Sequence, residues 1–220
     1  MGWMDRARGA VGRRKVDHRA VVGGLWEQIG KKQFEYLVEQ GLQPHHRFLD
    51  VGCGSLRGGI HFVRYLEPGH YYGLDIQQRL LDAGRKELDA VGLDPASASL
   101  MQDDSFRFGR FGQQFDVALA QSVFTHMSLN PIMRCLAEIE RVLKPEGRFY
   151  ATFFQHPGPR LNTEPLRQSE TVTTYPDADP FHYDPDVFRW AVEGSTLDVT
   201  VVGDWDHPRN QQMMVFTKRQ

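Results

Sequence analysis

A strand-like run that ends in a glycine turn constrains this chain more than any other stretch of the sequence. The apolar residues Phe48–Val51 are followed by alternate glycines, Gly52 and Gly54, and then by a helix-like segment. Glycine takes positive φ without steric cost and, lacking Cβ, lets a ligand lie against the main chain. A strand that runs through such a turn into a helix N-terminus predicts a backbone cradle for a nucleotide-like ligand. A turn with a purely structural role is the alternative.

Strand-like and helix-like segments alternate along the chain. Strands are predicted at Phe48–Val51, Tyr71–Ile76, Ser99–Gln102, Phe115–Ala120, Arg148–Phe154, Leu197–Asp204 and Gln212–Lys218. Helices are predicted at Leu25–Glu39, Ile60–Leu66, Arg79–Val91, Ile132–Leu143 and Asp186–Glu193. This alternation predicts an α/β fold with a parallel sheet covered on both faces. Only Trp205–Gln211 joins the last two strands, so those two are expected to pair antiparallel.

Length and composition limit the classes of protein that fit. The 220 residues suit a single domain, and a net charge of -2 provides no global basic field for nucleic acid. No apolar run approaches the length of a membrane span, and no signal-peptide core is visible. The two cysteines, Cys53 and Cys135, fit a reducing compartment. We therefore expect a cytoplasmic protein with neither a nucleic-acid nor a membrane partner, as a monomer or homodimer.

Two segments fall outside the alternating pattern. Residues 1–20 mix Gly, Arg and Lys without apolar periodicity, which predicts a flexible N-terminal tail; contact with RNA or anionic lipid is the alternative. Residues 21–220 are expected to form one domain that begins with a helix covering the site. Within it, Gln155–Asp184 shows no long periodicity. A loop of that length in a compact domain is usually functional, so we expect a lid-like insertion.

Acidic residues follow the second and third predicted strands. In an open α/β sheet, ligands bind outside the carboxyl ends of the strands. Asp75 closes the second strand, 25 positions beyond Asp50, near the place where an acid meets ribose hydroxyls. Asp103 and Asp104 follow the third strand, where a carboxylate can accept from an exocyclic amine. The pattern favours an adenosine-bearing ligand, although Asp75 also fits a solvated acid at a strand end.

The residues around the glycine turn distinguish the predicted ligand from a dinucleotide. The Gly-x-Gly-x-x-Gly pattern fails because Arg57 stands where the third glycine belongs. From Asp50 the spacing is Asp-x-Gly-x-Gly, which resembles the acidic-x-Gly-x-Gly-x-Gly motif of the class I S-adenosylmethionine-dependent methyltransferases. Leu56 stands in place of the third motif glycine. The opening of the fourth strand at Phe115 and the stretch Leu143–Phe149 also resemble that family.

The resemblance implies a fold, a cofactor and a set of residues that bind it. The fold is a three-layer α/β/α Rossmann-like sheet of seven strands in the order 3-2-1-4-5-7-6, with strand 7 antiparallel. The cofactor is S-adenosylmethionine, which leaves as S-adenosylhomocysteine, and no metal is implied. Gly52, Cys53 and Gly54 would line its methionyl part, Asp75 its ribose, and Asp103 or Asp104 its adenine. The full set implied for the cofactor is Asp50, Gly52, Cys53, Gly54, Arg57, Asp75, Ile76, Asp103, Asp104, Ser105, Gln121 and Ser122.

Candidate acid–base residues lie in segments predicted at the same end of the sheet. Methyl transfer to a hydroxyl or a protonated nitrogen requires a base to accept the proton, and histidine suits neutral pH. His126 follows the fourth strand and His156 the fifth, while Tyr183 ends the long insertion. A capping or packing histidine is the alternative for His126, and a loop residue for His156. An electron-rich carbon acceptor would need no strong base, and Tyr183 or a histidine would then orient it.

The leading hypothesis is methyl transfer to a small-molecule acceptor through oxygen, nitrogen or an aromatic carbon, such as a phenol or indole natural product. Aromatic residues near the predicted site favour an aromatic or apolar acceptor; they are Phe124, Phe153, Phe154, Phe181 and Trp205. Three alternatives stay open: a non-catalytic S-adenosylmethionine-binding protein, a protein or RNA methyltransferase, and a nicotinamide oxidoreductase. The signature of amino-methylating DNA enzymes is missing after the fourth strand, where Ala120–Val123 stands.

Overall fold

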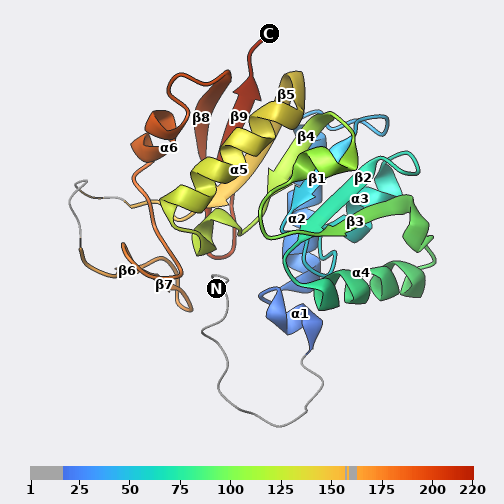
Figure 1. Ribbon diagram of the computed structural model, residues 1–220. Helices are drawn as coiled ribbons and strands as arrows, with labels where there is room; N and C mark the ends of the chain where they lie inside the picture. The colour runs from blue at the N-terminus through green and yellow to red at the C-terminus, as the bar shows by residue number, and fades with distance from the viewer. Residues whose placement is uncertain (1–16, 157, 159–162) are drawn as a thin grey trace.

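A seven-stranded mixed sheet forms the centre of the protein in the computed structural model, which describes residues 17–156, 158 and 163–220. Its strands lie in the order β3-β2-β1-β4-β5-β9-β8, and β9 runs antiparallel to both β5 and β8 (Figure 1). Counted within this sheet, the order is the predicted 3-2-1-4-5-7-6, which confirms the fold class. The strand bounds are β1 (Phe48–Val51), β2 (Tyr71–Asp75), β3 (Ala98–Gln102), β4 (Phe115–Ala120), β5 (Leu143–Phe153), β8 (Leu197–Asp204) and β9 (Gln212–Lys218).

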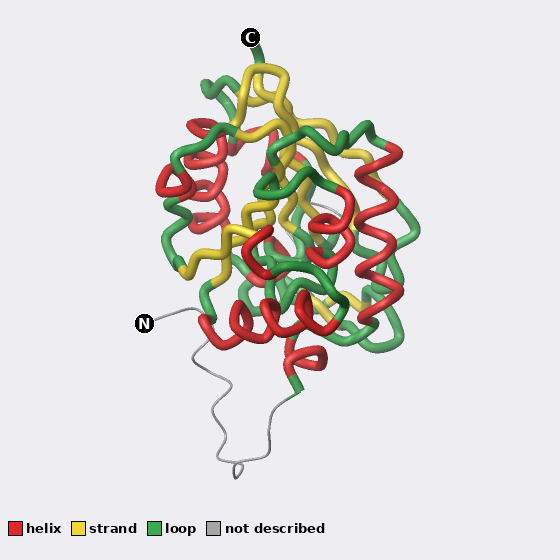
Figure 2. Tube along the Cα trace, turned by 90° about the vertical axis from the view of Figure 1, so that its right-hand side faces the viewer, coloured by secondary structure: helices red, strands yellow, loops and turns green. Residues whose placement is uncertain are grey.

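Helices cover both faces of the sheet, as Figures 1 and 2 show. On one face, α2 (Trp26–Glu39), α3 (Gly59–Tyr65) and α4 (Gln78–Ala90) pack around a core that includes Phe48. On the other, α5 (Leu129–Val142) and α6 (Asp186–Ala191) pack around a core that includes Leu49. Alternate residues of β1 thus enter opposite cores, because successive side chains of a strand point to opposite faces. Short 3-10 turns, η2 (Pro95–Ser97), η3 (Phe108–Phe111) and η4 (Phe124–His126), complete the layers.

The fifth strand starts earlier than its sequence indicates. The stretch 144–147 reads as a turn between a helix and a strand, yet β5 begins at Leu143, which pairs with Phe115 of β4. The register then shifts, so that Val117 pairs with Arg148. The extra residues form a bulge in which Glu146 takes a φ of 63°. Turn-forming residues are compatible with a bulge as well as with a turn, and the pairing of β4 with both ends of the stretch decides between them.

The N-terminal segment is structured from Asp17, which corrects the end of the predicted tail. Asp17 caps α1 (His18–Val21) by accepting from the Arg19 N–H at 2.9 Å. The Arg19 guanidinium forms two 2.8 Å hydrogen bonds with Glu87 on α4 and lies 4.7 Å from the ring centroid of Trp26. Contacts with distant segments, which periodicity does not register, hold this short helix on the domain. The rest of the predicted tail, residues 1–16, lies outside the described residues.

The segment predicted as a lid-like insertion contacts the domain through its backbone. It contains a short antiparallel ribbon, β6 (Leu166–Arg167) with β7 (Thr173–Thr174). The Phe181 N–H donates to Thr125 O in η4 at 2.8 Å, and Tyr183 bridges with Gln155 at the end of β5. In Figure 1 the ribbon and α1 both lie at the lower edge, where the parallel strands end. The described part of the insertion thus forms a wall at the carboxyl end of the sheet.

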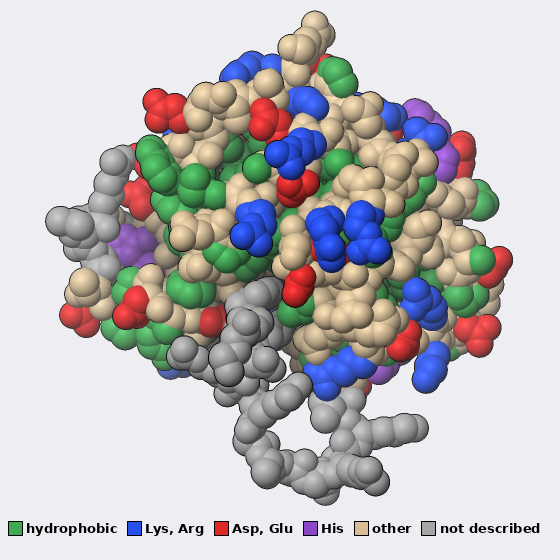
Figure 3. Space-filling model, in the orientation of Figure 1, with side chains coloured by type: hydrophobic (Ala, Val, Ile, Leu, Met, Phe, Trp, Pro, Cys, Tyr) green, Lys and Arg blue, Asp and Glu red, His purple; other side chains and the backbone are tan. Residues whose placement is uncertain are grey.

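The surface carries both signs of charge. On the face drawn in Figure 3, Lys and Arg side chains are interspersed with Asp and Glu. Cys53 and Cys135 are buried and unpaired. Among the described residues, no helix is long and apolar enough to cross a membrane.

Candidate functional site

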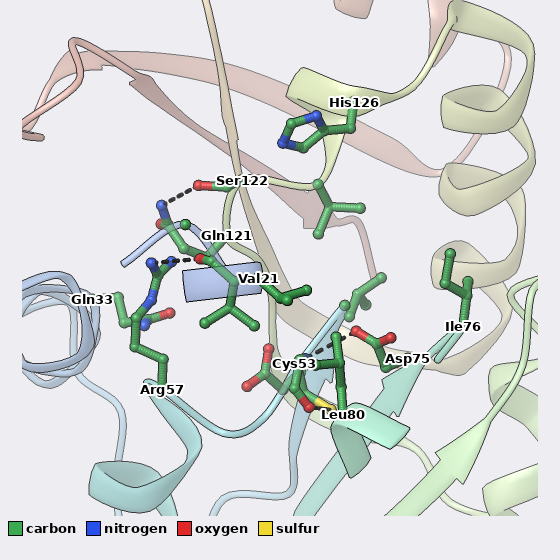
Figure 4. Close-up of a pocket in the computed structure, with 18 of the residues that line it drawn as sticks. Val21, Gln33, Cys53, Arg57, Asp75, Ile76, Leu80, Gln121, Ser122 and His126 are labelled. Carbon is green, nitrogen blue, oxygen red and sulfur yellow. Dashed lines mark hydrogen bonds between the residues drawn. The ribbon is translucent and has the colours of Figure 1, made fainter. Parts of the chain in front are cut away.

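A cavity of about 340 Å³ opens at the carboxyl ends of β1, β2, β4 and β5. Its size is within the range of small-molecule sites, about 300–1,000 Å³. The glycine turn after β1 forms its floor, the segment after α1 covers it, and η4 and the insertion form the far wall (Figure 4). This is the edge of the sheet at which open α/β folds bind ligands.

The glycine turn is held in place and leaves no room for side chains. Gly52 and Cys53 both donate their N–H to Leu74 O, at 2.7 and 3.0 Å. Gly52 has a φ of 70°, and a Cβ built on it would lie 2.6 Å from a Val123 methyl. Gly54 has a φ of 55°, and its Cβ would lie 2.7 Å from a methyl of Val22. Both glycines are therefore required by conformation and by close approach, and they leave the backbone exposed to the cavity.

Asp75 supports the turn and faces the same cavity. Its carboxylate accepts from the Gly54 N–H at 3.0 Å and from the Gln77 N–H at 2.8 Å. Burial raises the pKa of Asp75, while hydrogen bonds from Gln77, Gly54 and Ile76 act in the opposite direction. Two carboxylate oxygens offer about four acceptor positions, so about one position remains for a further donor. Ile76, predicted for the cofactor, lines the cavity beside it.

Asp50 and Cys53 lie beneath the turn. The Tyr71 hydroxyl donates to the Asp50 carboxylate at 2.6 Å. Burial, with a smaller contribution from Asp75, raises the pKa of Asp50 to about 7, although the Tyr71 hydrogen bond lowers it. Burial likewise raises the pKa of the Cys53 thiol well above its usual value, so this cysteine is a neutral packing group. Both residues, which were predicted to bind the cofactor, line the cavity.

Two guanidinium groups lie at the end of the cavity opposite Asp75. Arg57 donates to Val22 O at 2.9 Å and to Gly24 O at 3.0 Å, and Arg209 donates to Gly23 O. Burial and the neighbouring Arg209 lower the pKa of Arg57 to about 10. Within the described ranges, neither guanidinium has a carboxylate at ion-pair distance. Two lining cations without an acidic partner make this end suited to an anion.

A polar network forms the wall after β4. The Ser122 and Thr152 hydroxyls both donate to the side-chain oxygen of Gln211, at 3.0 and 2.7 Å. The side-chain nitrogen of Gln121 lies 3.3 Å from His207 Nε2. Burial, together with Arg57 and Arg209, lowers the pKa of His207 to about 3. Gln121 and Ser122, which were predicted to bind the cofactor, line the cavity. Gln211, which joins them, was not predicted because nothing in its local sequence marks it.

The residues after β3 do not lie where they were expected. The Asp103 carboxylate accepts from the Ser105 N–H at 2.7 Å and from Arg107 Nε at 2.6 Å, and Asp104 accepts from the Ser105 hydroxyl. These bonds order the loop after β3, and none of the three residues lines the cavity. Phe106, with a φ of 59°, lies in the wall instead. The two acids accept hydrogen bonds within their own loop, and the Phe106 ring lines the cavity in their place.

Of the three candidate acid–base residues, His126 alone lines the cavity. His156 and Tyr183 line a separate cavity near α6, where the rings of His156 and His182 are 5.2 Å apart. The Tyr183 hydroxyl donates to Met127 O, and burial raises the pKa of Tyr183. The structure therefore corrects the expected placement of His156 and Tyr183. Phe154, directly after β5, lines the main cavity, whereas the His156 N–H donates to Tyr183 O at 2.9 Å and both residues lie by the second cavity.

The N-terminal segment contributes residues that sequence reasoning did not assign. Val21, Val22 and Gly23 line the cavity above the glycine turn, and Gln33 of α2 lines it from the side. Gln33 is buried, with its amide 2.3 Å from a Cβ built on Gly58. The predicted cover by the N-terminal helix is therefore supplied partly by α2 and partly by the segment after α1.

Comparison with known proteins shows what this architecture resembles. Residues 49–149 match a family described as a methyltransferase domain. A phthiotriol/phenolphthiotriol dimycocerosates methyltransferase of Mycobacterium tuberculosis is 33% identical over 104 residues, 46% of this chain and 35% of the relative. A demethylmenaquinone methyltransferase of Symbiobacterium thermophilum is 26% identical over 140 residues, 60% of this chain and 51% of the relative. The chain thus matches about a third to a half of the length of these relatives.

Solved structures share the fold at low sequence identity. Magnesium protoporphyrin IX methyltransferase from Synechocystis PCC 6803, with bound S-adenosylmethionine, superposes with a TM-score of 0.63 at 13% identity over 97% of this chain and 86% of that one. The glycopeptide N-methyltransferase MtfA, in complex with S-adenosylhomocysteine, gives 0.64 at 15% identity over 87% and 90%. The CcbJ methyltransferase from Streptomyces caelestis gives 0.64 at 14% identity over 90% and 97%.

Proposed function

We propose that this chain, whose residues 49–149 match a methyltransferase domain family, is a class I S-adenosylmethionine-dependent methyltransferase that transfers a methyl group from that cofactor to a small-molecule acceptor. One observation carries the proposal: a single cavity has the glycine turn in its middle, a carboxylate at one end and two guanidinium groups at the other. S-adenosylmethionine has ribose hydroxyls and an amino-acid carboxylate at its two ends. The charges of the cavity complement both.

The residues present fit the cofactor. Asp75 retains about one acceptor position for a ribose hydroxyl, and Ile76, Leu80 and Phe106 offer an apolar surface for the adenine. The glycine turn lines the cavity, and the methionyl chain would lie against its backbone. Arg57 and Arg209 would hold the carboxylate. Asp103, Asp104 and Ser105 have no part in this arrangement because they lie outside the cavity.

The chain's own residues would position the reactants. The cofactor, when bound, supplies an electrophilic methyl group on a sulfonium sulfur, and the sulfur is the leaving group of an in-line displacement. Positioning can contribute roughly 7 kcal/mol or more in favourable cases. Beyond the glycine turn, Val123, Phe154, Val172 and Pro180 form an apolar chamber with His126 in its wall. These side chains would exclude water and hold an apolar acceptor against the methyl group.

A small acceptor agrees with the shape and charge of the molecule. The cavity is of small-molecule size, and the net charge of -2 provides no field for a nucleic acid. The names of the relatives also include small acceptors, among them a quinone precursor. A phenol or indole natural product is the class we favour. A cytoplasmic location, a single domain over residues 21–220 and a lid-like role for 155–184 complete the proposal.

Ligand binding and turnover test the proposal separately. S-adenosylhomocysteine at about 100 times its Kd should stabilise the fold by about 2.7 kcal/mol and raise the melting temperature by a few degrees. NADH at the same concentration should not, which separates this function from a nicotinamide oxidoreductase. Stabilisation by NADH alone would overturn the proposal.

Turnover is measured with methyl-labelled S-adenosylmethionine and a panel of phenols, indoles and amines, with a peptide mixture and total RNA as comparisons. Label in a small molecule supports the proposal. Label only in peptide or RNA would replace it with the corresponding macromolecular methyltransferase. Tight cofactor binding with no product in any arm would indicate a binding protein without turnover.

A further inference from the structure

At the apolar end of the cavity, His126 forms a hydrogen bond with a carboxylate that the cofactor does not need. His126 Nδ1 lies 2.6 Å from an oxygen of the Asp179 carboxylate, although the two residues are 53 positions apart. His126 comes from η4 and Asp179 from the insertion. Distances of 2.7–2.9 Å are usual for charge-assisted N–H···O bonds, so this contact is short and well formed. Both side chains are about half exposed, at 43% and 46%.

The backbone on each side of this pair is tied down. The Phe181 N–H donates to Thr125 O at 2.8 Å, and the Tyr183 hydroxyl donates to Met127 O. Three consecutive residues of the chain, 125 to 127, therefore each bind the insertion. Thr125 is fully buried, and Phe181 pairs with Tyr175 in a bridge of its own. This attachment distinguishes the pair from a surface contact between two mobile side chains, because such a contact contributes little to stability.

His126 is suited to take a proton at this end. When Nδ1–H donates to a carboxylate, Nε2 is left with its lone pair, and the carboxylate stabilises the imidazolium that forms. The other ionisable groups that line the cavity are Asp50, Cys53, Arg57, Asp75 and Arg209, all in the part assigned to the cofactor. In Figure 4 the His126 ring lies on Ser122's side of the cavity, away from Asp75. In the described wall of the apolar chamber, His126 is the only ionisable side chain.

We infer that His126 and Asp179 form a proton-accepting pair, and that the acceptor is an apolar compound carrying a weakly acidic hydroxyl, such as a phenol. This inference rests on the proposed function. The acceptor O–H bond breaks and its proton goes to His126 Nε2, while an oxygen lone pair forms the bond to the methyl carbon. The S–CH₃ bond breaks, its electron pair stays on sulfur, and S-adenosylhomocysteine leaves with the methyl ether. Asp179 acts as a positioning residue.

The test compares variants across phenols of graded acidity, with labelled S-adenosylmethionine at a pH near 7. General-base catalysis contributes typically 10²–10⁴-fold. We expect His126→Gln to lower kcat by about 100-fold for an unsubstituted phenol, and Asp179→Asn by about 10-fold. A nitrophenol that is already ionised at this pH needs no base, so both variants should approach wild type with it. The affinity for S-adenosylhomocysteine should be unchanged in both.

Asp177→Asn is the matched control, because Asp177 is an exposed acid of the same loop two residues away. It should turn over every phenol like wild type. Equal losses for all phenols, whatever their acidity, would show a structural role and overturn the inference. Wild-type kcat in His126→Gln, or wild-type products methylated only at carbon, would also overturn it while leaving the methyltransferase proposal standing. Failure of the wild type to bind S-adenosylhomocysteine would instead contradict the proposed function.

Discussion

The two ends of the cavity are built in different ways. The end at which we propose that the cofactor binds, the cofactor end, comes mostly from residues 50–58 and 74–77, where β1 and β2 turn into the next helices. The end at which we propose that the acceptor binds, the acceptor end, combines η4, the residue after β5 and two separate points of the insertion. The first is fixed by backbone hydrogen bonds within neighbouring segments, such as those from Gly52 and Cys53 to Leu74. The second depends on contacts between segments far apart in the chain.

Their electrostatics differ as well. At the cofactor end Asp50, Arg57 and Asp75 are all buried. Burial raises the pKa of the two acids and lowers the pKa of Arg57, which favours the neutral form of each group. At the acceptor end His126 and Asp179 are half exposed. Charges fixed in a buried site before the ligand arrives favour one ligand, whereas a half-exposed chamber with apolar walls tolerates more variation. The same domain can thus keep its cofactor while its acceptor changes.

The largest expected effect is at the point where the two ends meet. Gly52→Ala places a Cβ 2.6 Å from Val123 at a φ of 70°, so the turn must shift. A misplacement of about 1 Å can cost about 100-fold in rate, and we expect kcat/KM to fall at least that far. Gly92→Ala is the control, because Gly92 has a φ of 74° with nothing within 4 Å of its Cβ.

Both alanine variants carry the same backbone strain, about 1–2 kcal/mol for a residue in the left-handed region. Chemical denaturation should therefore show a similar loss of stability from that strain in both. Only Gly52→Ala should lose activity and affinity for S-adenosylhomocysteine. Equal activity of the two variants would mean that the crowding at Val123 does not matter.

Asp75→Asn tests the carboxylate of the cofactor end. Hydrogen bonds to charged groups contribute roughly 1.5–3 kcal/mol, so the Kd for S-adenosylhomocysteine should rise about 10-fold or more by calorimetry. Asp82→Asn on the exposed side of α4, where Asp82 pairs with Arg85, should leave the Kd unchanged. An unchanged Kd in Asp75→Asn would restrict this acid to its hydrogen bonds with Gly54 and Gln77.

Arg209→Gln tests the guanidinium pair with two ligands. S-adenosylhomocysteine carries the amino-acid carboxylate, and 5′-methylthioadenosine lacks the whole amino-acid part. Removing one charged hydrogen-bond donor should weaken the first about 10-fold and leave the second unaffected. Arg64→Gln, at an exposed position of α3, serves as the control. If both ligands weaken equally, Arg209 acts by holding Gly23 and not by binding the carboxylate.

The last expected effect concerns stability in acid and not ligand binding or rate. The pKa of His207 is lowered to about 3 in the fold, against about 6.5 in an unfolded chain. As the pH falls, His207 is protonated in the unfolded chain before it is protonated in the fold. Its contribution to the free energy of unfolding is therefore full above pH 6.5 and is lost as the pH falls towards 3. His207→Gln should flatten this part of the stability–pH curve, measured by denaturant titration. His45→Gln, exposed at the opposite end of the sheet, should reproduce the wild-type slope.

The sequence by itself determined the sheet, the glycine turn and the acid at the end of β2. Burial patterns with periods of 2 and 3.6 residues are local, and they placed the seven strands of the sheet and its main helices to within a few residues. The turn at Gly52 and Gly54 was predictable because its backbone conformation depends on residues that are adjacent in the chain. Asp75 was predictable because a residue that closes a strand of a parallel sheet has its position set by that sheet.

Only the tertiary structure decided which side chains reach the cavity from the loops. Asp103 binds its own loop and leaves Phe106 in the wall, while Tyr183 donates to Met127 and lies by another cavity. His126 meets Asp179 only because the insertion returns to η4. The direction of a loop side chain depends on contacts with segments tens of residues away, and these contacts leave no period in the sequence. The turn proposed to bind the methyl donor is thus encoded by neighbouring residues, and the pair proposed to act on the acceptor depends on the tertiary fold.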